Sequence, residues 1–155
     1  MDDNAFRVGI MQKINIVCIG KIKEKFYRDA VEEYLKRLSR FAKITVKELP
    51  EGKNPESEAA SVLKAASGEI VALCVEGESY SSEAFAGYIK NLTDSGKEAT
   101  FIIGSSCGLA DCVKNAARVR LSFSHMTFPH MLMRVILCEQ LYRAFMINGG
   151  GEYHK

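Results

Sequence analysis

The C-terminal part of the chain holds side chains that could bind an anion or move a proton. His130 and Arg134 are four residues apart, so on a helix they project from one face, whereas Arg143 lies on roughly the opposite face. The chain ends in GGGEYHK, in which glycines break the helix before Tyr153 and His154. Such a tail could close over a site, with the tyrosine stacking on a base and the histidine exchanging a proton. A hydrogen-bonded structural histidine at 130 and a frayed tail are the alternatives.

A glycine-containing loop, Gly104-Ser105-Ser106-Cys107-Gly108, lies between a predicted strand and a predicted helix. Glycine lets a ligand approach the backbone closely, and a helix N-terminus offers amide donors to an anion or nucleotide. The loop matches neither GxxxxGKS/T nor GxGxxG, so the standard ATP and NAD loops are disfavoured. Ser106 lacks the GxSxG spacing of a nucleophile elbow, which disfavours a serine hydrolase. A tight turn without a ligand is the alternative.

Metal sites, disulfides and paired catalytic carboxylates are not predicted. The five cysteines form no CxxC pair, and their odd number is typical of reduced thiols. Carboxylates are scarce in the basic C-terminal third, where Glu139 is spaced to form an i,i+4 ion pair with Arg143.

Five apolar segments alternate with helical patterns along the chain. Such alternation predicts right-handed crossovers, one parallel sheet and helices on both of its faces. Sites in such sheets lie outside the carboxyl ends of the strands, here after Val75, Ile103 and Ser122. The predicted strands are 13–20, 44–49, 69–77, 100–104 and 119–124, and the predicted helices are 26–41, 57–66, 81–92, one within 105–119 and one within 125–145.

The last predicted helix has too little polar surface for a solvated helix. Thr127 offers a hydroxyl cap, and Pro129 fits a first helical turn. Residues 131–145 are apolar on nearly every side, and a helix of that kind is buried on every side. A second copy of the chain is the simplest cover for the outer face, which predicts a homodimer through this helix. The first helix has apolar residues at helical spacing from Phe26 to Phe41.

Length and charge limit the function classes. A chain of 155 residues with 47% hydrophobic and 26% charged residues is one globular domain by size. Lys and Arg outnumber Asp and Glu by 11 to 7 in residues 1–48 and by 6 to 2 in residues 113–155, but they are outnumbered 4 to 10 in residues 49–112. Basic ends around an acidic middle allow a polyanionic partner, and a chance asymmetry of solvated faces is the alternative.

Neither a membrane span nor a signal peptide is predicted. No apolar stretch reaches the roughly 18 residues that a span needs, and the N-terminal MDDNAFRVGIMQK lacks an apolar signal core. We therefore expect a cytoplasmic protein without a membrane partner. Residues 1–12 are expected to form an N-terminal extension to a domain that spans 13–155.

Four segments together resemble one enzyme family. They are KINIVCIGKIKEKFYRDAVEEYLKR near the N-terminus, FIIGSSCGL, RLSFSHMTFPHMLMRVILCEQLYRAF and the terminal GEYHK. These segments closely resemble the SPOUT-superfamily methyltransferases that modify a pseudouridine of large-subunit ribosomal RNA, the ribosomal RNA large subunit methyltransferase H family. The resemblance extends over nearly the whole chain, from residue 12 to Lys155.

The resemblance implies a fold, a cofactor and a substrate. The fold would be a parallel-sheet α/β domain of the SPOUT type, whose C-terminal segment threads through a loop to form a trefoil knot. The knot would bind S-adenosylmethionine as methyl donor, without a metal, in an obligate homodimer whose site uses both protomers. The substrate would be N3 of a pseudouridine in the helix 69 loop of 23S rRNA in the assembled ribosome. A non-catalytic ribosome-binding or RNA-binding dimer of the same fold is the alternative.

Matching motifs carry the family's residue roles onto this chain. The resemblance implies that His130 and Arg134 bind the substrate. It assigns catalysis to Arg143, Tyr153 and His154, with His154 as the candidate proton acceptor. The implied cofactor-binding residues are Leu73, Gly104, Phe123, Ser124, His125, Met126, Thr127 and Phe128.

One position departs from the family pattern. Family members usually have two consecutive glycines after the strand, whereas here Gly104 is followed by Ser105. If the replaced glycine had a positive φ, serine would be strained there and the cofactor loop could differ. Because the neighbouring residues match the family, we expect the loop to adapt.

Overall fold

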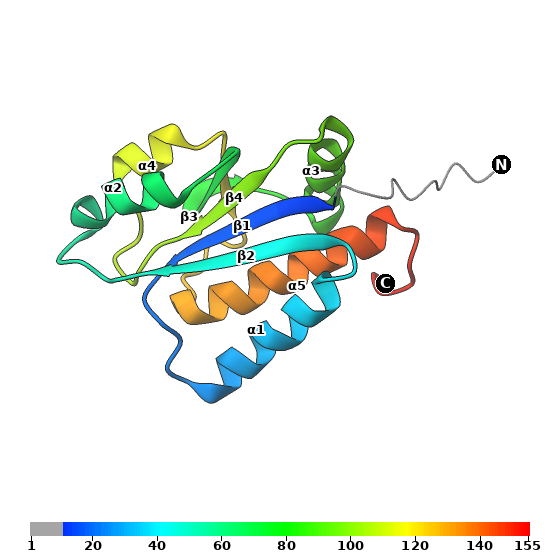
Figure 1. Ribbon diagram of the computed structural model, residues 1–155, viewed down its shortest axis with the longest axis horizontal. Helices are drawn as coiled ribbons and strands as arrows, with labels where there is room; N and C mark the ends of the chain where they lie inside the picture. The colour runs from blue at the N-terminus through cyan, green and yellow to red at the C-terminus, as the bar shows by residue number, and fades with distance from the viewer. Residues whose placement is uncertain (1–10) are drawn as a thin grey trace.

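The computed structural model describes residues 11–155, in which one parallel sheet lies between two layers of helices (Figure 1). The five strands follow the order β2-β1-β4-β3-β5, and every neighbouring pair is parallel. The predicted α/β class with a parallel sheet is therefore confirmed. The elements are β1 (Gln12–Ile19), α1 (Lys25–Leu38), β2 (Ala42–Leu49), α2 (Pro55–Ala65), β3 (Glu69–Ser79), α3 (Ser82–Ser95), β4 (Ala99–Ile103), α4 (Asp111–Ala116), β5 (Val119–Ser122) and α5 (His130–Asn148).

The sheet separates two apolar cores. Ile14, Ile16 and Cys18 of β1 face one core, and Val17 and Ile19 face the other, because successive side chains of a strand point to opposite faces. Helices α1, α3 and α5 cover the first face, and α2 and α4 cover the second (Figure 1). Burial on both faces explains why the central strands are continuous apolar runs in the sequence.

Capping groups decide where two of the helices begin. Asn54 and Ser57 form a capping box, so α2 begins at Pro55, two residues before the predicted start. Ser81 is the N-cap of α3, and its hydroxyl accepts a hydrogen bond from the Ala84 amide.

Helix α5 begins differently from the prediction. The predicted Thr127 cap is wrong, because α5 begins at His130 with Pro129 as its N-cap and without a side-chain cap. One face of α5 is buried against the sheet between α1 and α3. On its other face, Leu132 and Ile136 are only half-buried and belong to neither core.

The first strand begins one residue before the predicted start of the domain. Residues 1–10 of the predicted extension 1–12 lie outside the described residues, and Gln12 already belongs to β1. Phe26 does not join the core side of α1, since 66% of it is exposed. Between residues 11 and 155, no helix has the length and hydrophobicity of a membrane span. The trefoil threading of the C-terminal segment stays a prediction.

Candidate functional site

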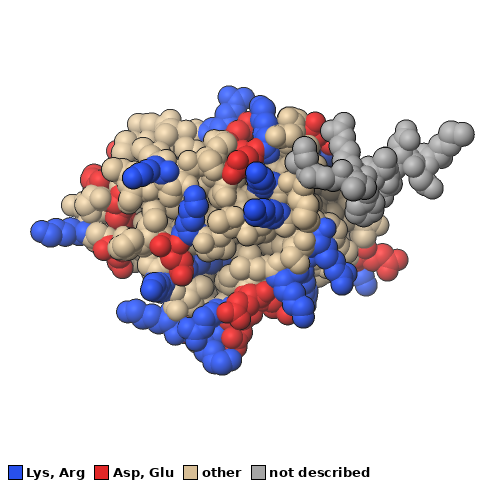
Figure 2. All heavy atoms as spheres, in the orientation of Figure 1, with Lys and Arg blue, Asp and Glu red and all other residues tan. Residues whose placement is uncertain are grey.

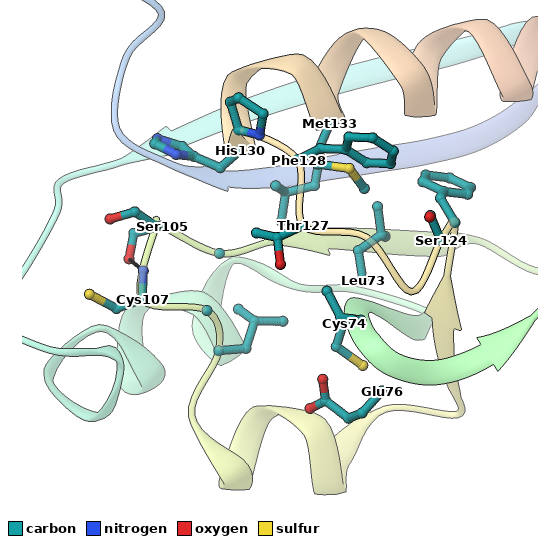
Figure 3. Close-up of a pocket in the computed structure, with 18 of the residues that line it drawn as sticks. Leu73, Cys74, Glu76, Ser105, Cys107, Ser124, Thr127, Phe128, His130 and Met133 are labelled. Atoms are coloured by element: carbon teal, nitrogen blue, oxygen red, sulfur yellow. Dashed lines mark hydrogen bonds between the residues drawn. The ribbon is translucent and has the colours of Figure 1, made fainter.

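The carboxyl ends of β3, β4 and β5 surround a cavity of about 640 Å³ (Figure 3). Its walls are the end of β3, the loop after β4 and the segment between β5 and α5. These are the three places at which the alternation of strands and helices predicted a site. Parallel sheets bind ligands at this edge because the loops that follow neighbouring strands meet there.

Most of the residues implied as cofactor ligands meet at this cavity, although they come from three separate segments. Seven of the eight line its walls, and only His125 does not. His130, implied as a substrate ligand, lines the same cavity. The seven are Leu73, Gly104, Phe123, Ser124, Met126, Thr127 and Phe128.

A register shift in β3 opens the cavity. Leu73 and Glu78 both pair with Leu121 of β5, so the residues between them loop out of the ladder. Gly77 lies in this bulge, where an added Cβ would be 2.6 Å from the carbonyl oxygen of Arg120. The bulge therefore requires glycine. Sequence reasoning missed it, although a glycine inside a strand pattern is a signal for a bulge.

The bulge brings an ion pair to the cavity wall. Cys74, Val75 and Glu76 line the cavity together with Lys114 of α4, and none of them was predicted. The Lys114 ammonium pairs with the Glu76 carboxylate. This hydrogen bond lowers the pKa of Glu76 and raises the pKa of Lys114, so both groups are charged at neutral pH. One end of the cavity thus has a charged pair beside largely apolar walls.

The loop after β4 is tightly closed. A Cβ at Gly104 would lie 2.5 Å from the carbonyl oxygen of Gly108, so no side chain fits there. The Gly108 amide donates to the carbonyl oxygen of Ser105 at 2.9 Å, and the φ of Gly108 is +81°. Ser105 is buried, and its hydroxyl accepts a hydrogen bond from the Cys107 amide at 3.3 Å (Figure 3).

Ser105 is not strained. Every non-glycine residue in the described part of the chain has a negative φ, and Ser105 is one of them. The left-handed position of this loop belongs to Gly108 instead. Serine is therefore accommodated here without a positive φ, and cofactor binding by this loop stays a prediction.

The segment between β5 and α5 keeps its shape through two serines. The Ser122 hydroxyl donates to the carbonyl oxygen of Ser124, and the Ser124 hydroxyl accepts from the Met126 amide, both at 3.0 Å. Phe123 packs edge to face against Phe85, with ring centroids 6.4 Å apart. The segment offers the cavity apolar side chains and backbone polar groups, which suits a ligand with an aromatic ring and several polar atoms.

Arg134 does not accompany His130 into the cavity. Only 3% of Arg134 is exposed, and its guanidinium donates to the carbonyl oxygens of Ile19 and Gly20 and pairs with Glu48 at 2.7 Å. Arg134 is buried because the turn of α5 that follows His130 lies over the ends of β1 and β2. In this structure Arg134 holds the start of α5 against the sheet and away from the cavity, and its implied role as a substrate ligand stays a prediction.

The three implied catalytic residues meet at the other end of α5, around Glu139. Arg143 donates to the Glu139 carboxylate through Nε at 2.9 Å and Nη2 at 2.6 Å, which confirms the predicted i,i+4 pair. The Tyr153 hydroxyl donates to the same carboxylate at 3.2 Å, and its ring lies 4.8 Å below the Arg143 guanidinium. His154 contacts Arg143 through Nδ1 at 3.1 Å and Glu83 through Nε2 at 2.7 Å.

The contacts of this cluster set its charges. Burial, followed by hydrogen bonding with Tyr34 and Glu139, raises the pKa of Tyr153 to about 12, so its phenol is neutral at physiological pH. The hydrogen bond to Glu139 raises the pKa of Arg143 further. Sequence reasoning did not foresee that one carboxylate, Glu139, would hold both residues.

The cavity and the cluster lie at opposite ends of one helix. His130 is the first residue of α5 and lines the cavity, whereas Arg143 comes 13 positions later. At 1.5 Å per residue, the two positions are about 20 Å apart. Figure 1 shows the chain terminus beside the far end of α5. Within one chain, the implied catalytic groups therefore do not reach the cavity.

Comparisons with known proteins give a consistent result. A family described as predicted SPOUT methyltransferase matches residues 12–154. Proteins named ribosomal RNA large subunit methyltransferase H are 44% identical in Streptococcus uberis and 46% identical in Lactobacillus acidophilus, each covering 92% of this chain and 99% of the relative. In fold, the chain is similar to a crystal structure titled as a methylase family protein from Neisseria gonorrhoeae. That likeness has a TM-score of 0.54 at 12% identity and covers 84% of this chain and 82% of the other.

Proposed function

Since the chain belongs to the SPOUT methyltransferase family, we propose that it methylates large-subunit ribosomal RNA with S-adenosylmethionine as the methyl donor. The names of relatives that are 44% and 46% identical over nearly their whole length support this substrate class. The finer proposal is transfer to N3 of a pseudouridine in helix 69 of 23S rRNA, in the assembled ribosome. Such a substrate would place the protein in the cytoplasm, as expected from the sequence.

The cavity at the carboxyl edge is the proposed cofactor site. Its volume lies within the usual range for small-molecule sites, and its walls combine apolar side chains with backbone polar groups. Gly104 and Gly108 both line the cavity, so this part of the wall offers a ligand backbone atoms without side chains. When bound, S-adenosylmethionine supplies a methyl group on a sulfonium, which is already a good electrophile. The proposed reaction therefore needs no metal, and the protein mainly aligns the donor with the base.

A homodimer would complete the site. The observation that carries this proposal is the separation of about 20 Å along α5 between the cavity and the Arg143 cluster. An antiparallel second copy, packed along α5, would bring the tail of one protomer to the cavity of its partner. The half-buried apolar residues Leu132, Ile136 and Met146, which belong to neither core, support α5 as the contact.

Arg143 of α5 and the tail residues Tyr153 and His154 would act on the proton and the developing charge. N3 must lose its proton as it attacks the methyl group, and His154 is the proposed acceptor. Arg143 would stabilise negative charge on the deprotonated ring, since its guanidinium is always protonated. The neutral phenol of Tyr153 could stack on the base but would not act as the general base. His130 would contact the base from the cavity side.

Methylation of ribosomes that lack the mark tests this proposal directly. The protein would be incubated with labelled S-adenosylmethionine and ribosomes from a strain without the modification, and the label mapped in 23S rRNA. Label at the helix 69 pseudouridine would support enzyme, substrate and cofactor together. If an active control enzyme labels these ribosomes and this protein does not, the methyltransferase proposal fails. The alternative of a non-catalytic dimer loses its one supporting feature, because Ser105 fits the loop without strain.

A further inference from the structure

The segment 21–28, KIKEKFYR, presents an exposed aromatic ring among cations. Phe26 is the second residue of α1 and is 66% exposed, and between residues 11 and 155 no other aromatic side chain is exposed. Its ring packs only partly against Tyr27, with centroids 4.4 Å apart. The apolar face of α1 enters the core later, at Val31 and Leu38. The burial of the sheet and its helices therefore does not explain a phenylalanine at position 26.

Exposed cations without an ion pair flank Phe26 in the sequence. Lys21, Lys23 and Arg28 are exposed and form no ion pair with any residue of the described part, whereas Lys25 pairs with Asp29. Figure 2 shows lysine and arginine side chains gathered over the start of α1. Cations near a helix N-terminus oppose the helix dipole, so these charges do not stabilise α1. A cationic surface of this kind fits a polyanion.

The start of this segment lies beside the first turns of α5, near the cavity residue His130. The carbonyl oxygen of Gly20, directly before the segment, accepts a hydrogen bond from Arg134 of α5 at 2.5 Å. A Cβ at Gly20 would lie 3.8 Å from the Met131 side chain, and Met131 follows the cavity residue His130. Figure 1 shows that α1 and α5 start at the same end of the sheet. A polymer that enters the cavity could therefore continue across segment 21–28.

We infer that segment 21–28 binds the single-stranded loop of the ribosomal RNA substrate, with Phe26 stacking on an unpaired base that neighbours the target. Lys21, Lys23 and Arg28 contact the phosphates of that loop. Stacking of a base on an aromatic ring beside backbone-binding cations is how proteins hold unpaired RNA. A second copy of this chain fits poorly, because four cations against one carboxylate in the segment would repel the same surface. The inference deepens the proposed function and depends on it for the identity of the RNA.

Direct RNA binding by the full chain tests the inference apart from catalysis. The probe is a fluorescent RNA hairpin with a single-stranded loop, titrated by anisotropy. Phe26→Ala should weaken binding by at least about fivefold, the lower end for removal of a base stack, and Phe26→Trp should keep the affinity. Lys23→Gln should reduce the slope of log affinity against log salt by about 0.7. Lys43→Gln, an exposed cation at the start of β2, is the charge-matched control and should leave the slope unchanged.

The outcomes separate this inference from the proposed function. If Phe26→Ala binds the hairpin as the wild type does, the inference is wrong even when the wild type methylates ribosomes. If the wild type does not methylate ribosomes and Phe26→Ala still lowers the affinity for the hairpin, segment 21–28 is supported as an RNA-binding surface and the methyltransferase proposal is wrong. If Phe26→Ala changes the oligomeric mass in sedimentation, the ring is a protein contact and the inference is overturned. Because Phe26 is exposed, a thermal melt should confirm that the variant folds.

Discussion

The guanidinium of Arg143 lies 3.1 Å from Nδ1 of His154, and this contact sets the state of the imidazole. A guanidinium only donates hydrogen bonds, so Nδ1 must be the acceptor, and Nε2 carries the hydrogen that it donates to Glu83 at 2.7 Å. His154 therefore has no free lone pair in this position. Its proposed role as proton acceptor requires the tail to leave Arg143, which movement toward the cavity of a partner would achieve.

Replacing His154 tests the role of the tail in proton transfer. We expect His154→Ala to lower kcat by about 100-fold or more, the usual contribution of a general base, with little change in cofactor affinity. Single-turnover methylation and calorimetric titration with S-adenosylmethionine measure the two quantities separately. An equal loss of turnover and cofactor affinity would remove His154 from this role.

Mixing two inactive variants tests whether the site is shared between protomers. Gly104→Ala should disable the cavity and His154→Ala the tail, and each alone should be nearly inactive. If the tail serves the partner's cavity, a mixed dimer regains one intact site, so an equal mixture recovers about a quarter of wild-type activity. No recovery, with subunit exchange demonstrated by mass, would mean that each chain uses its own tail.

Two glycines with opposite surroundings make a matched stability test. At Gly104, a Cβ would lie 2.5 Å from the carbonyl oxygen of Gly108, so Gly104→Ala should lower the free energy of unfolding by about 1–3 kcal/mol and weaken cofactor binding. At Gly87 in α3, an added Cβ would meet no heavy atom within 4 Å, so Gly87→Ala should raise the free energy of unfolding by about 0.5–1 kcal/mol. Urea unfolding measures both. A harmless Gly104→Ala would show that the loop has room to shift.

Two exposed cysteines give a test of the cofactor site that does not depend on activity. Cys107 and Cys112 are exposed, but only Cys107 lines the cavity. We expect S-adenosylmethionine to slow alkylation of Cys107 and to leave Cys112 unchanged, as followed by mass spectrometry. Burial raises the pKa of Cys18 to about 11 and of Cys138 to about 12, so these two thiols should react only after unfolding. Equal protection of Cys107 and Cys112 would argue against the cavity as the binding site.

Arg134 should behave as a positioning residue. Its guanidinium is buried and donates to two carbonyl oxygens, which Arg134→Met would leave without this donor, so the variant should lower the free energy of unfolding by roughly 1–3 kcal/mol. Denaturant unfolding measures this loss, and RNA binding of the still-folded fraction gives the second readout. Reduced RNA affinity with unchanged stability would support Arg134 as a substrate ligand.

Much of the fold and part of the site could be predicted from local pattern. The alternation of apolar strands with helices predicted the parallel sheet. Because ligands of parallel sheets bind at the carboxyl ends of the strands, this topology then predicted a site after β3, β4 and β5. The turn after β4 was recognisable because Gly104 and Gly108 bracket it. The i,i+4 spacing of Glu139 and Arg143 predicted their ion pair. The sheet, the turn and the ion pair depend on residues that are close in the sequence, and the position of the site follows from a rule that holds for parallel sheets.

Other features depended on contacts between distant segments. The register of β3 against β5 loops Cys74, Val75 and Glu76 into the cavity wall, although residues 69–77 alone read as a regular strand. Neither the burial of Arg134 nor the exposure of Phe26 follows from helical spacing, because spacing does not tell how a helix is rotated against the sheet.

By itself, the sequence determined which segments form the sheet and which residue types gather at its carboxyl edge, because hydrophobic periodicity and turn chemistry act over a few residues. Only the tertiary structure decided which groups meet at each end of α5, since the cavity joins the loops after β3, β4 and β5, and His154 of the tail joins Arg143 of α5 and Glu83 of α3. These meetings depend on how segments far apart in the sequence pack against one another, and that packing is a property of the whole domain.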